Sequence, residues 1–432
     1  MKIGIVGTGI AGMGCGHFLK DKAEIYFHER SDYAGGHTNT VTVTSPATTM
    51  EKAIYIDTGF MVFNHVTYPN LVNLFKELKV PTYPTDMSFS VQYLPDGLEY
   101  SGSGLNGLFA QRKNIFNLRH IRMLNQIGRF NKKSIRFIKS PPENGLKRAA
   151  DYTLGQYITE NKFGDDMLWR YLIPMSAAVW STPMEKMLEF PAQTLISFFY
   201  NHGFLGLTTQ HQWYTVSGGS RTYRDKIMAP FNDKIFLNDP VTNIIRKTDN
   251  EAPSRPLIVT RSGKQVEYDR VIIACHADEA LAMLDAPTAQ EKALLGKFHY
   301  EENLTVLHTD ESVMPKSKRV WSSWNYRVEE KNGKMVASCI YWMNSLQHIS
   351  GKKNYFVSLN DPDNIDESKI LNTINYTHPL FDMEAVRAQN ELQNLNRTGP
   401  VYFCGSYFKY GFHEDALASA VELCKNFNKF EQ

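Results

Sequence analysis

The sequence predicts an α/β protein that begins with a parallel, Rossmann-like sheet, and three observations carry this prediction. An apolar run, KIGIVG, opens the chain and is typical of a buried strand over residues 3–7. Glycines follow in a G-x-G-x-x-G frame at Gly7, Gly9 and Gly12. A second strand, EIYFHER, ends in Glu29. Such a frame alone indicates only a tight turn, but this order of strand, turn, helix, strand and acid indicates a dinucleotide-binding unit.

The glycine turn leads into a predicted helix over residues 10–20. In such a turn one glycine permits the reversal, one lets the backbone approach a diphosphate, and one packs the helix on the strand. The amide groups of Ile10, Ala11 and Gly12 would stand at the helix start, where the helix dipole also favours an anion. These residues are therefore candidates for holding a diphosphate.

Glu29 stands where a carboxylate accepts hydrogen bonds from the two hydroxyls of an adenosine ribose. Arg30 follows it and alone would indicate a nicotinamide cofactor with a 2′-phosphate. The Glu29 carboxylate would repel that phosphate, which argues against such a cofactor. We expect both residues to border the adenosine ribose.

Length and charge exclude some classes of protein. The 432 residues can form two domains or one large split domain. A formal net charge of +2 gives no support for a general nucleic-acid binder. The chain has no uninterrupted apolar run of about 18 residues, so we expect no membrane-spanning helix. Lys2 precedes the first apolar run as in a signal peptide, but glycines interrupt that run, so it is interpreted as mature structure.

The cysteines indicate free thiols. They are odd in number, scattered and without a C-x-x-C pair: Cys15, Cys275, Cys339, Cys404 and Cys424. This usage fits a reducing cytosol better than a disulfide scaffold or a zinc site. No H-E-x-x-H motif or pair of acids with ligand spacing is present, so we expect no metal. The expected location is cytoplasmic.

A second glycine loop, GGHT, follows Glu29 at Gly35, Gly36, His37 and Thr38. With it the chain resembles the flavin-dependent amine oxidase superfamily, which includes protoporphyrinogen oxidase and the phytoene desaturases. In that superfamily this loop lies against the flavin diphosphate and ribityl chain. The resemblance implies FAD as cofactor. It also implies a Rossmann-like FAD-binding domain of the glutathione reductase and amine oxidase type, with an α+β substrate domain.

Two internal segments extend the resemblance. DPVTNIIRKTD resembles the strand whose backbone, around Val241, pairs with the adenine edge. YDRVIIACHADEALAML resembles the strand and turn that re-enter the cofactor domain, which places Ala274 at the cofactor.

The C-terminal segment VYFCGSYFKYGFHEDALASAVELC resembles the last strand, flavin loop and closing helix of the superfamily. Gly405 and Ser406 would face the pyrophosphate or ribityl chain. Phe412 and His413 would begin the final helix, whose amide groups and dipole can stabilise negative charge on the flavin. One departure is Tyr407, which stands where many relatives have an acid that binds the ribityl chain.

The resemblance implies a discontinuous organisation. The FAD-binding domain would comprise residues 1–65, 205–275 and 395–432, and the substrate domain residues 66–204 and 276–394.

The pattern within the rest of the chain predicts further elements. Residues 82–102 read as a hairpin around a turn at Pro95–Gly97. Strands are predicted at 303–309, 318–325 and 335–343, helices at 118–139, 150–160 and 165–180 with Pro174 bending or ending the last, and surface loops at 247–256 and 360–368.

The most specific resemblance begins at Asp57, Thr58 and Gly59, which should return the chain to the flavin. Together with IPMSAAVWSTP and GGSRTY, this run is similar to a branch of flavoproteins that in plants is fused to cyclopropane fatty acyl synthases. In bacteria that branch is often found beside related lipid methyltransferases. The resemblance implies an apolar, lipid-like substrate and a lipid methyltransferase partner.

Three functions remain open from the sequence. The first is oxidation or desaturation of a modified acyl chain, with hydride passing to the flavin and a base removing a proton. The second is a flavin amine oxidase, which needs an aromatic cage and a lysine that spacing does not locate. The third is an accessory protein that binds flavin without turnover. His413 and Tyr410 are the candidates for proton transfer, whereas Glu414 and Asp415 are interpreted as helix-start acids.

Residues 117–140 carry seven Lys and Arg residues beside an apolar stripe. A basic amphipathic helix of this kind can lie on an anionic membrane, which predicts peripheral contact with the inner membrane face. The alternative is a solvated helix that packs its apolar side on the substrate domain.

Overall fold

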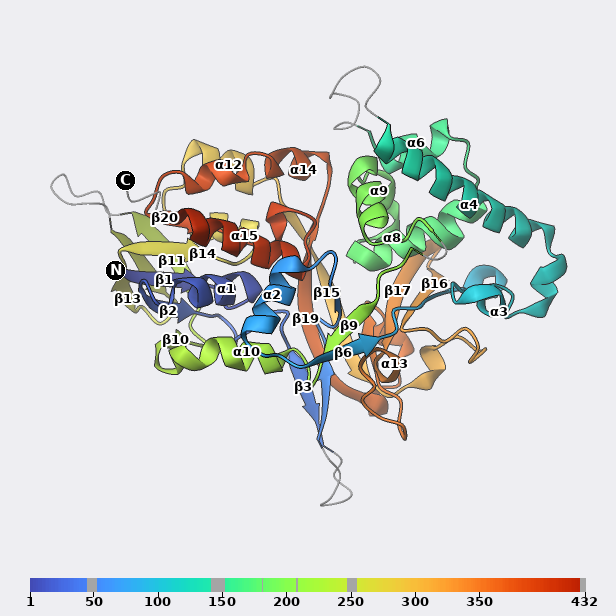
Figure 1. Ribbon diagram of the computed structural model, residues 1–432, viewed down its shortest axis with the longest axis horizontal. Coiled ribbons are helices and arrows are strands. Elements are labelled where there is room, and N and C mark those ends of the chain that lie inside the picture. The colour runs from blue at the N-terminus through green and yellow to red at the C-terminus, as the bar shows by residue number, and fades with distance from the viewer. Residues whose placement is uncertain (45–52, 141–151, 181, 207–208, 247–254, 428–432) are drawn as a thin grey trace.

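The computed structural model describes residues 1–44, 53–140, 152–180, 182–206, 209–246 and 255–427. The molecule is elongated, with both chain termini at one end and helices α4 (Leu118–Lys139) and α3 (Gly104–Leu108) at the other (Figure 1). The long strands β15 (His299–His308) and β19 (Ile370–Leu380) lie between these ends (Figure 1). No helix in the described part of the chain is long and apolar enough to cross a membrane.

A parallel sheet forms the end that holds the termini. Its order is β10-β2-β1-β14-β20, and every neighbouring pair is parallel. The strands are β1 (Lys2–Val6), β2 (Glu24–His28), β10 (Ile235–Phe236), β14 (Arg270–Ile273) and β20 (Val401–Phe403). Its central strands are buried and rich in Ile and Val, as strands covered on both faces are. The predicted parallel sheet is confirmed.

Helices α1 (Ile10–Leu19) and α15 (His413–Asn426) pack side by side on this sheet. A Cβ on Gly14 would stand 2.8 Å from Leu417, so a small residue permits the close approach. All five cysteines are free thiols, and the Cys15 and Cys404 sulfurs lie 3.6 Å apart where α1 meets β20. The start of the chain is thereby packed against its last helix.

The second large sheet has seven strands in the order β19-β15-β18-β17-β16-β7-β8. Its other strands are β18 (Phe356–Leu359), β17 (Lys334–Trp342), β16 (Trp324–Lys331), β7 (Phe89–Tyr93) and β8 (Leu98–Ser101). The hairpin of β7 and β8 closes around Gly97, whose φ of +69° suits glycine.

Three predictions on this side of the molecule need correction. The strand at 318–325 is wrong except at its end, because β16 begins only at Trp324 and a turn bonds the Val320 amide to Ser317. Residues 82–85 are not part of the hairpin: they form β6, which pairs with β9 (Trp213–Val216). Within the predicted surface loop 360–368, Asp361 and Ile365 are buried.

The helical prediction for 165–180 holds, but proline does not end it. The segment consists of α7 (Asp165–Met167), a π-helical turn at Leu168–Leu172 and α8 (Ile173–Trp180). Pro174 has no N–H for the Arg170 carbonyl four residues earlier. The Tyr100 hydroxyl donates to that carbonyl instead, at 2.6 Å.

The remaining elements confirm or extend the prediction. Helix α4 matches its predicted range, and α6 (Leu154–Glu160) begins later than predicted, after a capping box at Thr153. Most of the predicted loop at 247–256, and residues 150–151, lie outside the described residues. The other elements are α2 (Pro69–Glu77), α9 (Ala192–Asn201), α10 (Arg221–Met228), α11 (Ala277–Met283), α12 (Ala289–Leu295), α13 (Met343–Gln347), α14 (Met383–Gln389), β3 (Thr40–Val43), β4 (Ile54–Asp57), β5 (Phe63–Asn64), β11 (Val241–Arg246), β12 (Pro256–Thr260) and β13 (Gln265–Glu267).

Candidate active site

The glycine turn has the geometry of a diphosphate loop. Gly7 has a φ of +95°, and a Cβ on Gly12 would stand 2.0 Å from the Gly7 carbonyl oxygen. Both positions therefore require glycine for the fold. Gly9 differs, because its φ is −60° and a Cβ there would meet no atom within 4 Å. No acid and no side-chain cap stand in the first turn of α1, so the amide groups of Ile10–Gly12 are available to an anion.

Glu29 directly follows β2, and its carboxylate accepts hydrogen bonds from residues of two loops. Oε2 accepts hydrogen bonds from the Thr8 amide at 3.0 Å and the Thr8 hydroxyl at 2.6 Å. Oε1 accepts one from the Ser31 amide at 3.0 Å. A carboxylate has about four lone-pair positions, so Oε1 retains one for a ribose hydroxyl. Arg30 is exposed and forms an ion pair with Glu279 on α11.

The segment before β11 returns to the same end of the sheet. The Asn238 amide donates to the Ser31 carbonyl at 2.9 Å, and the Asp239 amide lies 3.4 Å from the Glu29 carbonyl. Val241 follows at the start of β11 and is partly buried. The structure therefore brings Val241 close to the acid that ends β2.

The second glycine loop lies against the first. A Cβ on Gly36 would stand 3.4 Å from the Gly9 Cα, and the Gly35 amide donates to the Thr8 hydroxyl at 3.0 Å. Gly59 packs next to this loop, since its Cβ would stand 2.3 Å from the His37 carbonyl oxygen. Three segments predicted to meet at a cofactor are thus in mutual contact.

Asp57 joins this loop cluster to two other parts of the chain. Its buried carboxylate accepts hydrogen bonds from the Ser220 amide at 2.8 Å, the Gln347 amide group at 2.7 Å and the Thr40 hydroxyl at 2.5 Å. Burial raises the pKa of Asp57 to about 6. Because protein donors occupy the carboxylate, Asp57 fixes the position of Thr58 and Gly59, whose backbone faces the loop.

The C-terminal segment follows β20, the edge strand beyond β14. A Cβ on Gly405 would stand 3.3 Å from the Cys275 carbonyl oxygen, next to Ala274, and the Gly405 amide donates to Ser419 at 2.9 Å. Ser406 begins a 3-10 turn. The Gly411 amide donates a hydrogen bond to the Ser406 carbonyl at 3.2 Å and so closes the loop between them. The tyrosine that replaces an acid, Tyr407, is buried and its hydroxyl has no partner.

His413 is held by two residues that the sequence did not single out. Its Nε2 and the Tyr223 hydroxyl share a hydrogen bond of 2.7 Å, and its ring stacks on Phe60 at 3.9 Å. The Tyr223 hydroxyl also lies 3.2 Å from the Thr38 hydroxyl. Burial lowers the pKa of His413 to about 3, so its imidazole is uncharged near pH 7. The start of α15 is therefore fixed to the second glycine loop.

Two buried histidine nitrogens in this region have no partner. They are His37 Nε2 and His378 Nδ1. The His37 ring stacks on Tyr376 at 4.6 Å and lies 5.2 Å from the His378 ring, both on β19. Burial lowers the pKa of His37 to about 4 and that of His378 to about 3. Since buried polar atoms in native proteins are normally paired, these nitrogens indicate a ligand with polar atoms.

An apolar cavity of about 830 Å³ lies between α8 and the seven-stranded sheet. Its lining includes Ala177 and Ala178 on α8, and Met335 and Ala337 on β17. Such a volume is typical of a site for one small molecule.

The pairing of β15 with β19 connects this cavity to the loop cluster. Glu301 and Asn303 line the cavity, and they stand opposite His378 and Tyr376 in the strand register. Residues directly opposite in an antiparallel pair point to the same face. The side chains that border the cavity therefore share a sheet face with those that contact His37.

Aromatic side chains form the wall between α8, α9 and the start of α15. Phe412 stacks on Phe198 at 4.8 Å and lies 6.1 Å from Trp180. The Trp180 indole donates to the Tyr410 carbonyl at 3.2 Å. Burial raises the pKa of Tyr410. Tyr410 is thus held at this wall by its backbone, with its phenol half-buried.

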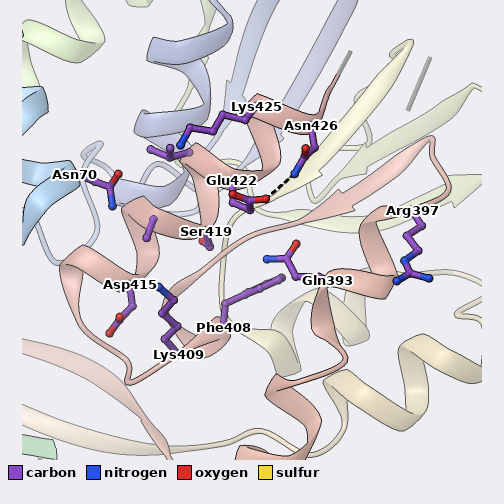
Figure 2. Close-up of a pocket in the computed structure, with 12 residues that line it drawn as sticks. Asn70, Gln393, Arg397, Phe408, Lys409, Asp415, Ser419, Glu422, Lys425 and Asn426 are labelled. Atoms are coloured by element: carbon purple, nitrogen blue, oxygen red, sulfur yellow. Dashed lines mark hydrogen bonds between the residues drawn. The ribbon is translucent and has the colours of Figure 1, made fainter. Parts of the chain in front are cut away.

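A second, polar cavity of about 620 Å³ runs along the outer side of α15 (Figure 2). Asp415 and Lys409 lie at one end of it and Lys425 at the other. Asp415 accepts a hydrogen bond from the Phe412 amide at 3.0 Å, as a helix-start acid does. Glu414 instead accepts from the Leu71 amide at 3.0 Å, so it caps α2 and not its own helix.

Within the described residues, no group of three or more His, Cys, Asp or Glu side chains is placed to hold a metal ion. Neither of the two cavities is lined by the glycine loops, which lie between the parallel sheet and β19.

Comparisons with known proteins agree with this geometry. The family of flavin-containing amine oxidoreductases matches residues 10–367. A search of curated proteins finds no match. Among solved structures, putrescine oxidase bound to putrescine has a TM-score of 0.66 at 13% identity, with 99% of each chain covered. Cyclohexylamine oxidase from Brevibacterium oxydans has a TM-score of 0.64 at 13% identity, with 99% of each chain covered. A fatty acid isomerase from P. acnes that produces CLA has a TM-score of 0.66 at 13% identity, with 99% of this chain and 98% of that chain covered. At such identities the likeness shows a shared fold.

Proposed function

The chain belongs to the flavin-containing amine oxidoreductase family and is an FAD-dependent oxidoreductase, and we propose that its substrate is an apolar, lipid-like molecule. We propose oxidation or desaturation of a modified fatty acyl chain as the reaction. The observation that carries this proposal is the largely apolar cavity that shares a sheet face with the loop cluster through β15 and β19. An acyl chain fits such a lining because burial of its methylene groups is favourable.

We propose that the loop cluster holds the FAD. The amides of Ile10–Gly12 would bind the diphosphate, and Glu29 the adenosine ribose. The unpaired nitrogens of His37 and His378 support this fit, because a flavin or its ribityl chain supplies hydrogen-bond partners. Other candidates for cofactor contact are Gly7, Gly9, Arg30, Gly35, Gly36, Thr38, Thr58, Gly59, Val241, Ala274, Gly405, Ser406, Phe412 and His413.

We propose that the domains follow the predicted division of the chain. All strands of the parallel sheet fall within residues 1–65, 205–275 and 395–432, which would form the FAD-binding domain. The strands of the seven-stranded sheet fall within residues 66–204 and 276–394, which would form the substrate domain. A lipid methyltransferase would act on the same class of acyl chain, and we propose such an enzyme as partner.

Bound FAD supplies a hydride acceptor for a substrate carbon–hydrogen bond. The chain must orient the acyl carbon and exclude water from it. The aromatic wall of Trp180, Phe198 and Phe412 suits this role, because it is apolar and held by stacking. We propose His413 as a residue that positions the start of α15, and Tyr410 as the remaining candidate for proton transfer.

Replacement of His413 by glutamine should reduce the turnover rate without changing its pH profile. The His413 pKa of about 3 leaves the ring uncharged across the usual assay range, so its titration cannot shape that profile. The measurement is kcat against pH for the wild type and the variant. A basic or acidic limb that disappears in the variant would instead assign proton transfer to His413.

Anaerobic mixing of the holoenzyme with candidate substrates tests the proposed function. Phospholipids and free fatty acids with methyl-branched or cyclopropane chains are expected to bleach the flavin absorbance, whereas putrescine and cyclohexylamine are expected to leave it unchanged. Bleaching by amines alone would show that the protein is an amine oxidase. No bleaching by any substrate, in a protein that light reduces normally, would make it an accessory protein.

The amine oxidase alternative has one specific observation in its favour. Glu185 and Glu301 line the cavity, and a carboxylate there could bind an ammonium group. Glu301 already pairs with Lys186 at 3.0 Å, however, which leaves Glu185 as the available carboxylate.

Filling the cavity should discriminate substrate binding from flavin binding. The variant Ala337→Phe adds a ring on β17, where the side chain is only partly buried and faces the cavity. We expect KM for the lipid to rise at least about tenfold, since the ring occupies the volume of several methylene groups. The flavin spectrum and photoreduction should not change. The control is Val66→Phe, which adds the same ring at an exposed site. Equal KM values in the two variants would show that the substrate does not bind in this cavity.

A further inference from the structure

Four large apolar side chains are exposed in the segment that runs from α3 into α4. The exposed fractions are 75% for Leu105, 44% for Ile115, 86% for Phe116 and 78% for Leu118. We call these four residues the apolar tip. They come from α3, the 3-10 turn at Arg112–Phe116 and the first turn of α4. This segment lies at the end of the molecule farthest from the chain termini (Figure 1).

The backbone beneath the apolar tip is well bonded. The Asn117 side chain caps α4 by accepting from the Arg119 amide at 3.0 Å. His120 Nε2 and the Leu108 carbonyl share a hydrogen bond of 3.0 Å, which joins α4 to α3. The Arg112 guanidinium donates to the Phe109 carbonyl at 3.0 Å and so ties the 3-10 turn to α3. The apolar side chains are therefore presented to solvent by a fixed platform, which costs hydration free energy without an internal gain.

The chain segment that carries the apolar tip has charges of one sign. No acidic residue occurs between Glu99 and Glu143, and nine Lys and Arg residues do. Lys113 and Arg122 are exposed within or close to the tip. The acids Asp96 and Asp166 are near, but both pair with Arg119 and Arg170. An apolar tip with a basic border is complementary to an anionic lipid bilayer, which is apolar inside and negative at its surface.

The stripe on α4 that the sequence suggested for membrane contact faces the protein instead. Phe130 is fully buried, and Leu124 and Ile127 pack against the core. Arg129 and Lys133 bind Asn161 through their cationic groups. The long helix therefore supports the tip, and its apolar stripe is not free for lipid.

We propose that the apolar tip inserts into the surface of an anionic phospholipid bilayer, with the surrounding Lys and Arg side chains on the headgroups. The proposal does not depend on the substrate, because binding is measured without turnover. The apolar tip is connected to the cavity through the end of β7. Tyr93, the last residue of β7, lines the cavity. The turn that follows carries Asp96, which pairs with Arg119 in the first turn of α4. Docking there would bring lipid near the cavity.

Vesicle flotation of the holoenzyme tests the proposal. Vesicles of phosphatidylcholine with phosphatidylglycerol should carry the protein, whereas vesicles of phosphatidylcholine alone should carry much less. The double variant Phe116→Ser, Leu118→Ser should lower the partition coefficient at least about tenfold. The variant Lys113→Gln, Arg122→Gln, at two exposed cations, should weaken binding at low salt and reduce its salt dependence. Val66→Ser with Leu371→Ser removes exposed apolar side chains elsewhere and should bind like the wild type.

A fluorescent variant gives an independent measurement. The emission of Phe116→Trp, compared with that of the wild type, should shift to the blue when anionic vesicles are added. Absence of wild-type binding, unchanged binding of the serine variant, or an unshifted emission would each overturn the proposal. It would also be overturned if the serine variant converts a dimer to a monomer, because the tip would then contact a second copy of the chain.

Discussion

The variant Gly9→Val is expected to fold normally and to lose its yellow colour. A side chain at this position meets no protein atom within 4 Å, and its φ of −60° suits any L residue. The added methyl groups would instead occupy the space through which the diphosphate approaches the start of α1. We expect FAD affinity to fall at least about a hundredfold, which corresponds to about 2.7 kcal/mol.

The apoproteins of the wild type and the variant are titrated with FAD, and flavin fluorescence monitors the binding. The melting temperature of each apoprotein is also recorded. The matched control is Gly128→Ala in the middle of α4, where a Cβ also meets no atom within 4 Å. That change should leave FAD affinity unaltered and stabilise the helix by about 0.5–1 kcal/mol. A Gly9→Val protein that binds FAD as tightly as the wild type would show that the diphosphate does not approach this turn.

Acidification should destabilise the protein steeply below about pH 6.5. Burial lowers the pKa of eight histidines: to about 4 for His28, His37, His202, His276 and His308, to about 3 for His378 and His413, and below its ordinary value for His120. Below about pH 6.5 the unfolded chain protonates these rings while the folded chain keeps them neutral. The unfolded state therefore binds more protons, and the free energy of unfolding falls as the pH falls from about 6.5 towards 4.

Four acids contribute with the opposite sign, because burial raises the pKa of their carboxyl groups: Asp57, Asp361, Glu414 and Asp415. Burial raises the pKa of Asp57 to about 6 and that of Asp415 to about 7. Each contributes stability below its unfolded pKa that is lost as the pH rises through its folded pKa. The acids therefore offset part of the histidine effect between about pH 4 and 6, but four acids oppose eight histidines.

Urea unfolding at several pH values between about 7.5 and 4.5 measures this dependence. The variant His378→Gln should reduce the slope by about one proton, or about 1.4 kcal/mol per pH unit. His299→Gln, at an exposed position at the start of β15, is the control. A slope that is the same in the wild type and in His378→Gln would mean that His378 titrates alike in the folded and unfolded chains.

The local part of the site could be predicted from the sequence because its signals are close together in the chain. The strand, the turn at Gly7–Gly12 and the helix that follows are set by spacing over a few residues, and the structure has them within one or two residues of the prediction. The strand at 318–325 failed because its apolar residues could not reveal that Ser322 and Asn325 bond each other in a turn. The composition of this segment is typical of a strand, but these local hydrogen bonds delay the start of β16 to Trp324.

The long-range part of the site could not be predicted. The bond between Tyr223 and His413 joins residues 190 positions apart, and the donors to the Asp57 carboxylate come from positions as distant as Gln347. The pairing that sets Asn303 opposite Tyr376 depends on strand register, which no local pattern in β15 specifies. The carboxylate of Glu414 likewise caps a helix far away in the chain.

The interleaved order of the parallel sheet has a consequence for synthesis on the ribosome. Strand β14 lies between β1 and β20, which are made far apart in time, and α1 lies against the much later α15. The seven-stranded sheet ends with β19, so the nascent chain contains all of its strands before β20 and α15 are made. The edge of β14 that pairs with β20, and the apolar face of α1 that packs against α15, stay uncovered until those elements are made, and we expect chaperones to bind the chain there.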